Sequence, residues 1–136
     1  MASVFTAIID GTAPAYKVYD DALVCAFLSR DANRLGHTLV VPKIEVDRFT
    51  DVPEPHYSAV FTAAKTLARA IHVATSCKRV GAVIAGWDVP HFHFHLIPMF
   101  EYEDLDPARA QRYADDDNRR MQRRIVDELA RLDGRA

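Results

Sequence analysis

The chain has 136 residues, of which 49% are apolar and 26% charged, and its formal net charge is −2. This length predicts one domain, residues 1–136, and the near-neutral balance excludes the strongly basic surface of a nucleic-acid-binding protein. The first residues show no charged-then-apolar secretory pattern, and no apolar run approaches the ~20 residues of a membrane span. Cys25 and Cys77 have no CxxC spacing and are predicted to be buried free thiols. We therefore expect a cytoplasmic protein with no membrane or nucleic-acid partner.

Short segments separated by turn residues fill the N-terminal part of the chain. Residues 4–9 precede Gly11 and fit either a helical turn or a strand. Residues 15–19 alternate between apolar and polar, and residues 22–28 follow directly, so the two segments predict a β-hairpin. Residues 37–42 are β-branched and apolar and predict a third strand.

The apolar period changes in the segment 55–78, which predicts a long amphipathic helix. Its apolar stripe recurs at steps of three and four and comprises Val60, Ala64, Leu67, Ile71 and Ala74. Residues 79–85 and 91–97 predict a fourth and a fifth strand. Strands and helices joined by short connections indicate an α+β fold with a five-stranded antiparallel sheet.

The segment 106–136 is predicted to be a C-terminal helical extension. Asp106 is a good N-cap and Pro107 suits the first helical position, so a polar helical region should open there. A final helix ending near Gly134 is expected to have one narrow apolar face made of Met121, Ile125, Leu129 and Leu132.

The predicted fifth strand carries three of the six histidines of the chain. Alternate side chains of a strand point to opposite faces, so His91, His93 and His95 should share one face. The other face should then carry Phe92, Phe94 and Leu96 and pack on the long helix. Three polar rings on one face need a reason beyond folding, because β-branched and aromatic residues suit a strand better.

Three interpretations of this histidine face remain open. The rings could be structural residues with satisfied hydrogen bonds, or they could supply nitrogen ligands to zinc. The third interpretation is catalysis at a phosphoryl centre, in which a neutral imidazole attacks phosphorus while neighbouring groups donate hydrogen bonds to the phosphate oxygens. His37, on the predicted third strand, is the candidate for such an added group.

Three segments of the sequence resemble the histidine-triad (HIT) family. Residues 91–97 match its pattern of three histidines alternating with apolar residues. Residues 36–43 are similar to its Gly-His-Thr-Leu-Val-Ile-Pro-Lys segment, and residues 8–21 resemble its N-terminal entry. The order and spacing of the segments agree with the family over about residues 3–100.

The resemblance implies a nucleotide hydrolase that works through a covalent nucleotidyl-histidine intermediate and usually forms a two-fold homodimer. His93 would be the nucleophile and His95 a phosphate ligand, while His91 would orient the site and His37 would lie against it. A glutamine at the third position marks the transferase branch, so His95 favours a hydrolase of phosphoramidates or dinucleoside polyphosphates. The alternative is a non-catalytic nucleotide-binding protein with the same fold.

The resemblance also implies a nucleoside pocket. Its apolar walls would include Phe5 and Ile8 on one side and Phe27 on the other, although plain core packing explains these residues equally well. Ser29 stands where many members place an acidic ribose ligand. The Gly-Gln-Ser/Thr that precedes the triad elsewhere is replaced here by Gly86-Trp87-Asp88, which puts Asp88 near the phosphate.

Many bacterial members of the family bind zinc through two N-terminal cysteines and further histidines. Ser3 and Thr6 stand at the cysteine positions and Glu45 at a histidine position. We therefore expect neither zinc nor any other cofactor.

Overall fold

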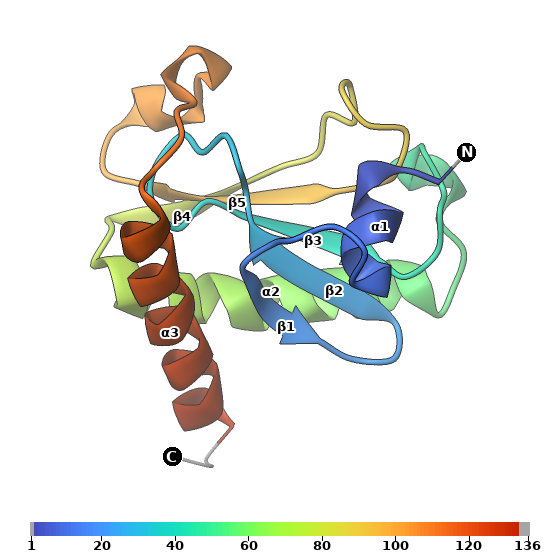
Figure 1. Cartoon of the computed structure of the whole chain (residues 1–136), viewed down its shortest axis with the longest axis horizontal. Helices are drawn as coiled ribbons and strands as arrows, with labels where there is room; N and C mark the ends of the chain where they lie inside the picture. Colours follow the sequence, from blue (N-terminus) through green and yellow to red (C-terminus); the bar gives the residue numbers. More distant parts are fainter. Residues whose placement is uncertain (1, 134–136) are drawn as a thin grey trace.

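The computed structural model describes residues 2–133 and has an α+β fold, as the sequence predicts (Figure 1). An antiparallel sheet with the strand order β1-β2-β3-β5-β4 forms its centre. The strands are β1 (Lys17–Asp20), β2 (Val24–Leu28), β3 (Thr38–Pro42), β4 (Arg79–Val83) and β5 (Phe94–Met99). The α-helices are α1 (Val4–Asp10), α2 (His56–Thr75) and α3 (Asp115–Leu132). None of the helices in the described part of the chain is long and apolar enough to cross a membrane.

The two faces of the sheet are covered by different helices, with α1 in front and α2 behind in Figure 1. The α2 face holds the larger apolar cluster, in which the predicted α2 stripe packs on strand residues such as Val24, Val40 and Leu96. The α1 face holds a smaller cluster made of Phe5, Ile8, Cys25, Phe27, Leu39 and Val41. Strand alternation produces this division, because successive side chains of β2 and β3 point to opposite faces.

The N-terminal segment, which the sequence left open, forms the helix α1. Ser3 caps its start by accepting a hydrogen bond from the Thr6 N–H at 3.1 Å. Gly11 ends the helix in the left-handed region at φ 81°, a conformation that glycine adopts without strain. Phe5 and Ile8 are therefore held against the sheet by a helix only two turns long.

The fifth strand begins at Phe94 and not at residue 91, so the prediction of one continuous histidine strand was wrong at its start. The ladder between β3 and β5 runs only from Thr38↔Leu96 to Val40↔Phe94. Beyond it, Pro42 has no N–H to donate, and its carbonyl oxygen faces the His91 ring at 2.9 Å. Residues 91–93 lie before β5, and the Phe92 N–H donates to the Val46 carbonyl instead.

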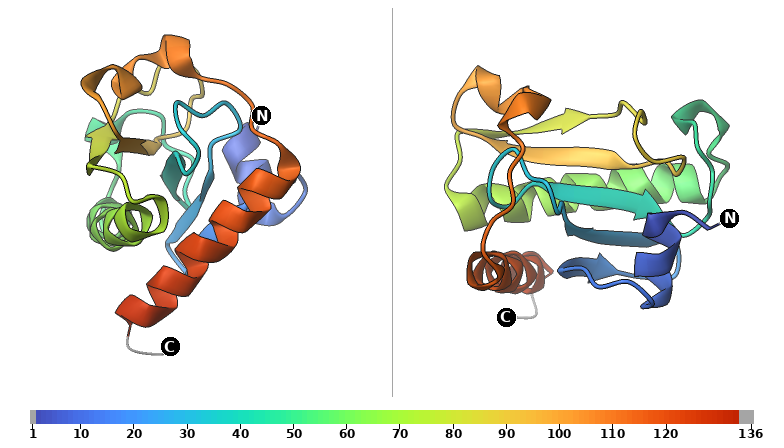
Figure 2. Two further views of the ribbon diagram at one scale, coloured as in Figure 1. Left: turned by 90° about the vertical axis from the view of Figure 1, so that its left-hand side faces the viewer. Right: turned by 45° about the horizontal axis from the view of Figure 1, so that its top comes forward.

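The C-terminal prediction was right about the last helix and wrong about where it begins. Asp106 does act as a cap, accepting from the Ala108 N–H at 2.9 Å, but the turn it caps is a single 3-10 turn, Pro107–Arg109. The helix α3 starts at Asp115, buries Met121, Ile125 and Leu129, and packs on α2 and beside β1 (Figure 2). Leu132, which was predicted to belong to the same apolar face, is 41% exposed and does not pack in the core. Gly134 lies outside the described residues, and the division of the chain at residue 106 stays a prediction.

A buried carboxylate, Asp104, holds the loop that leads into β3. Its oxygens accept hydrogen bonds from Arg34 Nε at 2.7 Å and Arg109 Nη1 at 3.0 Å, and from the backbone N–H groups of Phe100 and Glu101. Its carbonyl oxygen accepts from Asn33 Nδ2 at 2.8 Å. Burial by itself raises the pKa of Asp104, but these hydrogen bonds outweigh burial and lower the pKa to about 2.

Replacing Asp104 with asparagine should lower stability at neutral pH and remove part of its dependence on acid. The folded chain holds this group ionised down to about pH 2, whereas its ordinary pKa is 3.8. The stability it contributes is therefore present above about pH 4 and is lost as the pH falls toward 2. Urea unfolding of Asp104→Asn at pH 7 should show a loss of about 1–3 kcal/mol and a shallower decline between pH 4 and 2. The exposed neighbour substitution Glu103→Gln is the control, and an equal decline in all three proteins would contradict this account.

Candidate functional site

The histidines of the motif and the upstream histidine gather at one place on the α1 face of the sheet. The ring centroids of His93 and His95 are 4.9 Å apart, and those of His37 and His95 are 5.2 Å apart. Phe5 of α1 lies edge-on to His93 with a centroid distance of 5.0 Å. Phe92 and Phe94 point to the opposite face, into the cluster with α2. The predicted division between a histidine face and a phenylalanine face is therefore present, although only His95 lies within β5.

The ring of His93 is held in one tautomer by its own backbone neighbourhood. Its Nδ1 lies 2.8 Å from the carbonyl oxygen of His91, which can only accept, so Nδ1 carries the proton. The neutral ring then has its lone pair on Nε2. A hydrogen bond that fixes one nitrogen as a donor prepares the other as a base or nucleophile.

His37 and His95 form a chain of hydrogen bonds with a single direction. The backbone N–H of Asn33 donates to Nδ1 of His37 at 3.1 Å, so the proton of the neutral His37 ring sits on Nε2. That Nε2–H faces Nδ1 of His95 at 3.0 Å. His95 therefore accepts on Nδ1, and its own proton lies on Nε2, where it is available to a ligand.

Both rings of this hydrogen-bond chain, His37 and His95, are held neutral. Burial, with a smaller contribution from the neighbouring His95, lowers the pKa of His37 to about 3. Burial also lowers the pKa of His95 to about 4, with His93 acting in the same direction and the charge of Asp88 acting against it. At neutral pH the group that faces the site is thus a neutral donor.

His91 is fully buried, and both of its ring nitrogens have partners. Nε2 lies 2.9 Å from the carbonyl oxygen of Pro42, and Nδ1 lies 2.8 Å from the hydroxyl of Ser3. Burial lowers its pKa, while the hydrogen bond to the Pro42 carbonyl opposes that shift. A ring in this position supports the residues around it and has no free nitrogen for a substrate.

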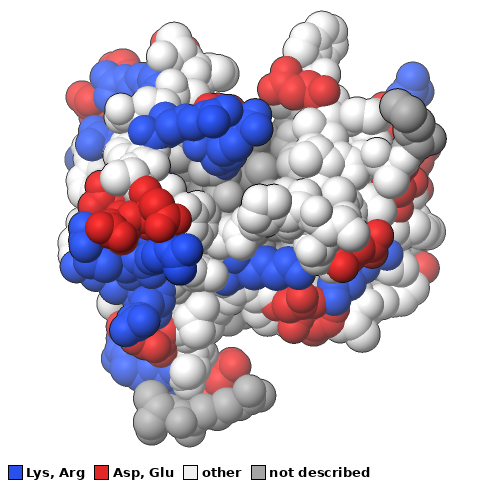
Figure 3. Space-filling view, viewed as in Figure 1, with Lys and Arg blue, Asp and Glu red and all other residues white. Residues whose placement is uncertain are grey.

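The predicted nucleoside residues line the same face of the sheet. Phe5, Ile8 and Phe27 are buried together, with the rings of Phe5 and Phe27 5.5 Å apart. Figure 3 shows an uncharged surface on this face beside α1, with Lys, Arg, Asp and Glu side chains around it. Ser29 is half-buried, and its hydroxyl donates to the Asp31 carbonyl at 2.8 Å. Asp88 is exposed.

The tryptophan of the loop before the triad does not cover the core. Trp87 is 92% exposed, so its side chain lies outside the core. It stands two positions before Val89, which packs against the apolar cluster of the α1 face. The loop is thus attached to this cluster at Val89 and leaves Trp87 open to solvent.

Two supporting residues were not predicted from the sequence as part of the site. Asn33 acts through its backbone N–H, and Asp104 acts by holding the Asn33 side chain. A backbone donor has no signature in residue type, and Asp104 lies 71 positions from Asn33 along the chain. Only the folded arrangement reveals either role.

The residues present do not fit the zinc site that many bacterial members of the family carry. Ser3, Thr6, Glu45 and His91 come together, but hydroxyls are poor zinc ligands compared with thiolates and imidazoles, and these groups already bond to one another. Among the described residues, no group of three or more His, Cys, Asp and Glu side chains could hold a metal ion.

The neutral histidines should make stability depend on pH in the mildly acidic range. Their ordinary pKa is 6.5, and in the folded chain it falls to about 4 for His95 and about 3 for His37. Unfolded chains therefore take up protons that the folded chain refuses, so stability is highest above about pH 6.5 and declines toward pH 4. Chemical unfolding at steps of pH should show a flatter decline for His37→Gln than for the unaltered protein. The substitution of an exposed histidine, His72→Gln, is the control, and a flatter decline there too would contradict the assignment.

Comparison with known proteins agrees with this geometry. The HIT domain model matches residues 10–102. An uncharacterized HIT-like protein of Methanocaldococcus jannaschii is 34% identical over 108 residues, covering 72% of this chain and 79% of its own. The adenosine 5′-monophosphoramidase of Saccharomyces cerevisiae is 33% identical over 98 residues, covering 71% of this chain and 62% of its own.

Solved structures show the same fold over the full length. A Zn-bound histidine triad family protein of Mycobacterium smegmatis has a TM-score of 0.84 and 28% identity, and the match covers 100% of this chain and 99% of that one. The histidine motif, the order of the strands and the match of the domain model lead to one conclusion: this chain belongs to the HIT family.

Proposed function

We propose that this protein is a nucleotide hydrolase that cleaves the bond between a nucleoside 5′-phosphoryl group and a leaving group X. The observation that carries the proposal is the tautomer of His93, whose Nδ1–H is bound to the His91 carbonyl at 2.8 Å and whose Nε2 keeps its lone pair. This arrangement suits attack on phosphorus by a neutral ring.

The reaction would proceed in two displacements at the α-phosphorus. In the first, His93 Nε2 forms a bond to phosphorus, the bond to X breaks, and X leaves with the bonding electrons and takes up a proton from solvent. The ring becomes cationic, and the hydrogen bond from Nδ1–H to the His91 carbonyl strengthens as the charge develops. In the second, water attacks phosphorus and releases a proton to solvent, the electrons of the N–P bond return to Nε2, and the nucleoside monophosphate leaves with His93 neutral again.

His95 would bind the phosphate as a neutral donor throughout both steps. Its Nε2–H is set by the chain of hydrogen bonds that starts at the Asn33 N–H and passes through His37. A donor that needs no reorientation during the reaction stabilises the charge that builds on the phosphoryl oxygens. The neutral rings lower the stability of the folded chain at acid pH, because burial keeps them from taking up a proton.

The leaving group X is inferred from a relative and not from the geometry of the histidines. The yeast relative is named an adenosine 5′-monophosphoramidase, which supports a nitrogen-linked X and an adenine base. Phe5, Ile8 and Phe27 are packed together in the apolar cluster of the α1 face and are only 2–8% exposed, so they would form the floor beneath a planar base more than a surface in contact with it. Phosphoramidates are therefore the first substrates to test, with dinucleoside polyphosphates beside them. The cytoplasmic location and the homodimer stay predictions.

The His93→Ala variant should lose at least about 10³-fold in turnover of adenosine 5′-phosphoramidate, because no other ring presents an equally free nitrogen. Steady-state release of AMP measures this loss, with His72→Gln as a matched control that replaces an exposed histidine. Rapid quenching of the unaltered protein should also trap an adenylyl group on His93, detectable by mass spectrometry. Binding of AMP without turnover or adduct would instead favour a non-catalytic nucleotide-binding protein.

Trp87 provides a direct test of binding, because it is the one tryptophan in the sequence and is 92% exposed. A nucleotide bound beside the loop should quench its fluorescence or shift its emission to shorter wavelength as a base or leaving group covers the ring. Titration with AMP should give a saturable change that is absent with inorganic phosphate. Trp87→Phe should keep His93 chemistry while raising KM about twofold to tenfold. An emission spectrum that AMP leaves unaltered would place the ligand away from this loop.

A further inference from the structure

A hydrogen-bonded cluster joins the first turn of α1 to the segment that carries the nucleophile. It contains Ser3, Thr6, Glu45 and His91, which the sequence separates by up to 88 positions. We infer that Ser3 and Glu45 are positioning residues for His93 and act through His91. The inference rests on the proposed function for its effect on turnover, and on the geometry alone for its effect on the rings.

The donor and acceptor roles within the cluster can be assigned one by one. The Pro42 carbonyl only accepts, so Nε2 of the neutral His91 ring carries the proton and Nδ1 must accept. The partner of Nδ1 is the Ser3 hydroxyl at 2.8 Å, which therefore donates its one proton to Nδ1 and not to the Thr6 hydroxyl at 3.3 Å. The same oxygen accepts from the Thr6 N–H at 3.1 Å as the cap of α1. Ser3 is 8% exposed and His91 fully buried, so no bulk water replaces this donor.

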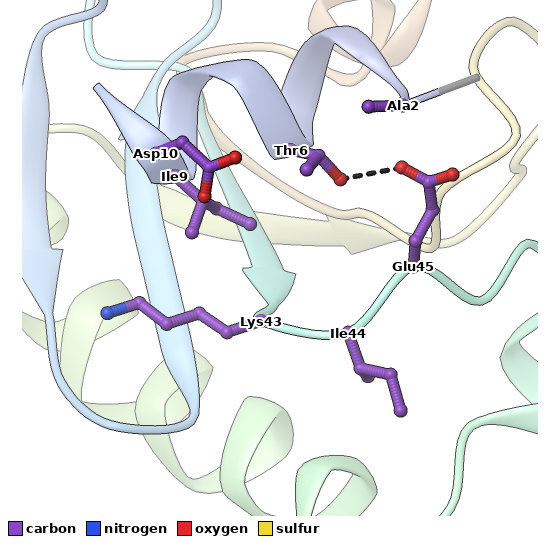
Figure 4. Close-up of a pocket in the computed structure, with 7 residues that line it drawn as sticks. All are labelled: Ala2, Thr6, Ile9, Asp10, Lys43, Ile44 and Glu45. Atoms are coloured by element: carbon purple, nitrogen blue, oxygen red, sulfur yellow. Dashed lines mark hydrogen bonds between the residues drawn. The ribbon is translucent and has the colours of Figure 1, made fainter. Parts of the chain in front are cut away.

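Glu45 also holds Ser3 and the first turn of α1. Its Oε1 accepts from the Ser3 backbone N–H at 2.7 Å and from the Thr6 hydroxyl at 2.6 Å. Figure 4 shows this carboxylate beneath the first turn of α1, with the bond from Thr6 drawn. Hydrogen bonds from Ser3 and Thr6 lower the pKa of Glu45, so it remains an ionised acceptor. These bonds therefore connect the first turn of α1 to the segment that follows β3.

The cluster reaches His93 through the backbone of His91. The His91 ring is held between α1 and the end of β3, and its carbonyl oxygen receives the Nδ1–H of His93 at 2.8 Å. Phe5, on the same turn as Ser3 and Thr6, lies edge-on to both rings, with centroids 5.8 Å from His91 and 5.0 Å from His93. Movement of the first turn would therefore alter the acceptor and the packing of the attacking ring together.

The chemistry of this hydrogen-bonded cluster differs from that of the zinc site that many bacterial members of the family carry. Two hydroxyls, one carboxylate and one imidazole form neutral and charge-assisted hydrogen bonds that hold α1, the residues after β3 and the triad together. A metal would require the imidazole nitrogen that Ser3 already occupies. The positioning task is thus done here by side chains of this chain alone.

The decisive variant is Ser3→Gly, tested in the full-length protein. Glycine is tolerated at a helix N-cap, so α1 should keep its start, while the donor to His91 is lost. We expect kcat for adenosine 5′-phosphoramidate to fall about tenfold to a hundredfold, with KM altered about twofold or less. The ¹⁵N NMR shift of His91 Nδ1 should move, and His93 should lose its single Nδ1–H tautomer.

Three further variants separate positioning from general weakening. Ser3→Thr keeps a hydroxyl and should restore both kcat and the NMR shifts. Thr12→Ala removes the hydroxyl that bonds the Ala7 carbonyl at 3.1 Å at the far end of α1 and should change neither. Glu45→Ala should move the same shifts as Ser3→Gly, by less, because His91 keeps its partner.

Two outcomes would overturn the inference: unchanged His91 and His93 shifts in Ser3→Gly, or a loss in Thr12→Ala equal to that in Ser3→Gly. Absence of turnover in the unaltered protein would sink the proposed function instead. The NMR shifts would still decide the positioning role, because they do not depend on catalysis.

Discussion

Four imidazole rings lie close together, and burying an imidazole favours its neutral form and requires hydrogen-bond partners for the nitrogens that lose contact with water. Each ring has at least one fixed partner: the Asn33 N–H for His37, His37 for His95, the Pro42 carbonyl and the Ser3 hydroxyl for His91, and the His91 carbonyl for His93. Only Nε2 of His93 and Nε2 of His95 are left for a ligand. In the described residues no buried side-chain nitrogen or oxygen lacks a partner. The backbone partners can only accept (the Pro42 and His91 carbonyls) or only donate (the Asn33 N–H), so they fix the tautomers of His91, His93 and His37, and the tautomer of His95 follows from that of His37.

The supporting structure can be understood from this constraint. On one side Asp104 holds the loop whose Asn33 N–H starts the chain through His37 to His95. On the other side Ser3, at the cap of α1, supplies the donor that His91 needs. Asn33 and Ser3, which contact the rings directly, lie far from the histidine motif in the sequence, whereas Asp104 follows it closely. The sheet between them provides a rigid base, because β3 and β5 pair directly beneath the rings.

The solvent-facing residues near the site do not belong to the hydrogen-bond network that fixes the rings. Trp87 and Asp88 belong to an exposed loop, and the Ser29 hydroxyl is already bonded to the Asp31 carbonyl. These are the positions where this chain departs from the pattern of the family it belongs to. In the proposed reaction, the chemistry would depend on the buried hydrogen bonds, and the choice of leaving group and sugar would depend on these residues.

The sequence alone determined the α+β class, most of the strands, the long helix and the identity of the four histidines, because apolar periodicity and motif spacing are local properties. It placed the start of β5 too early, since alternation continues through residues 91–93 although the partner strand ends at Pro42, which has no N–H to offer. Only the tertiary structure decided which nitrogen of each ring carries a proton. That choice depends on carbonyls, backbone amides and hydroxyls of Pro42, Asn33 and Ser3, which folding brings to the rings from elsewhere in the chain.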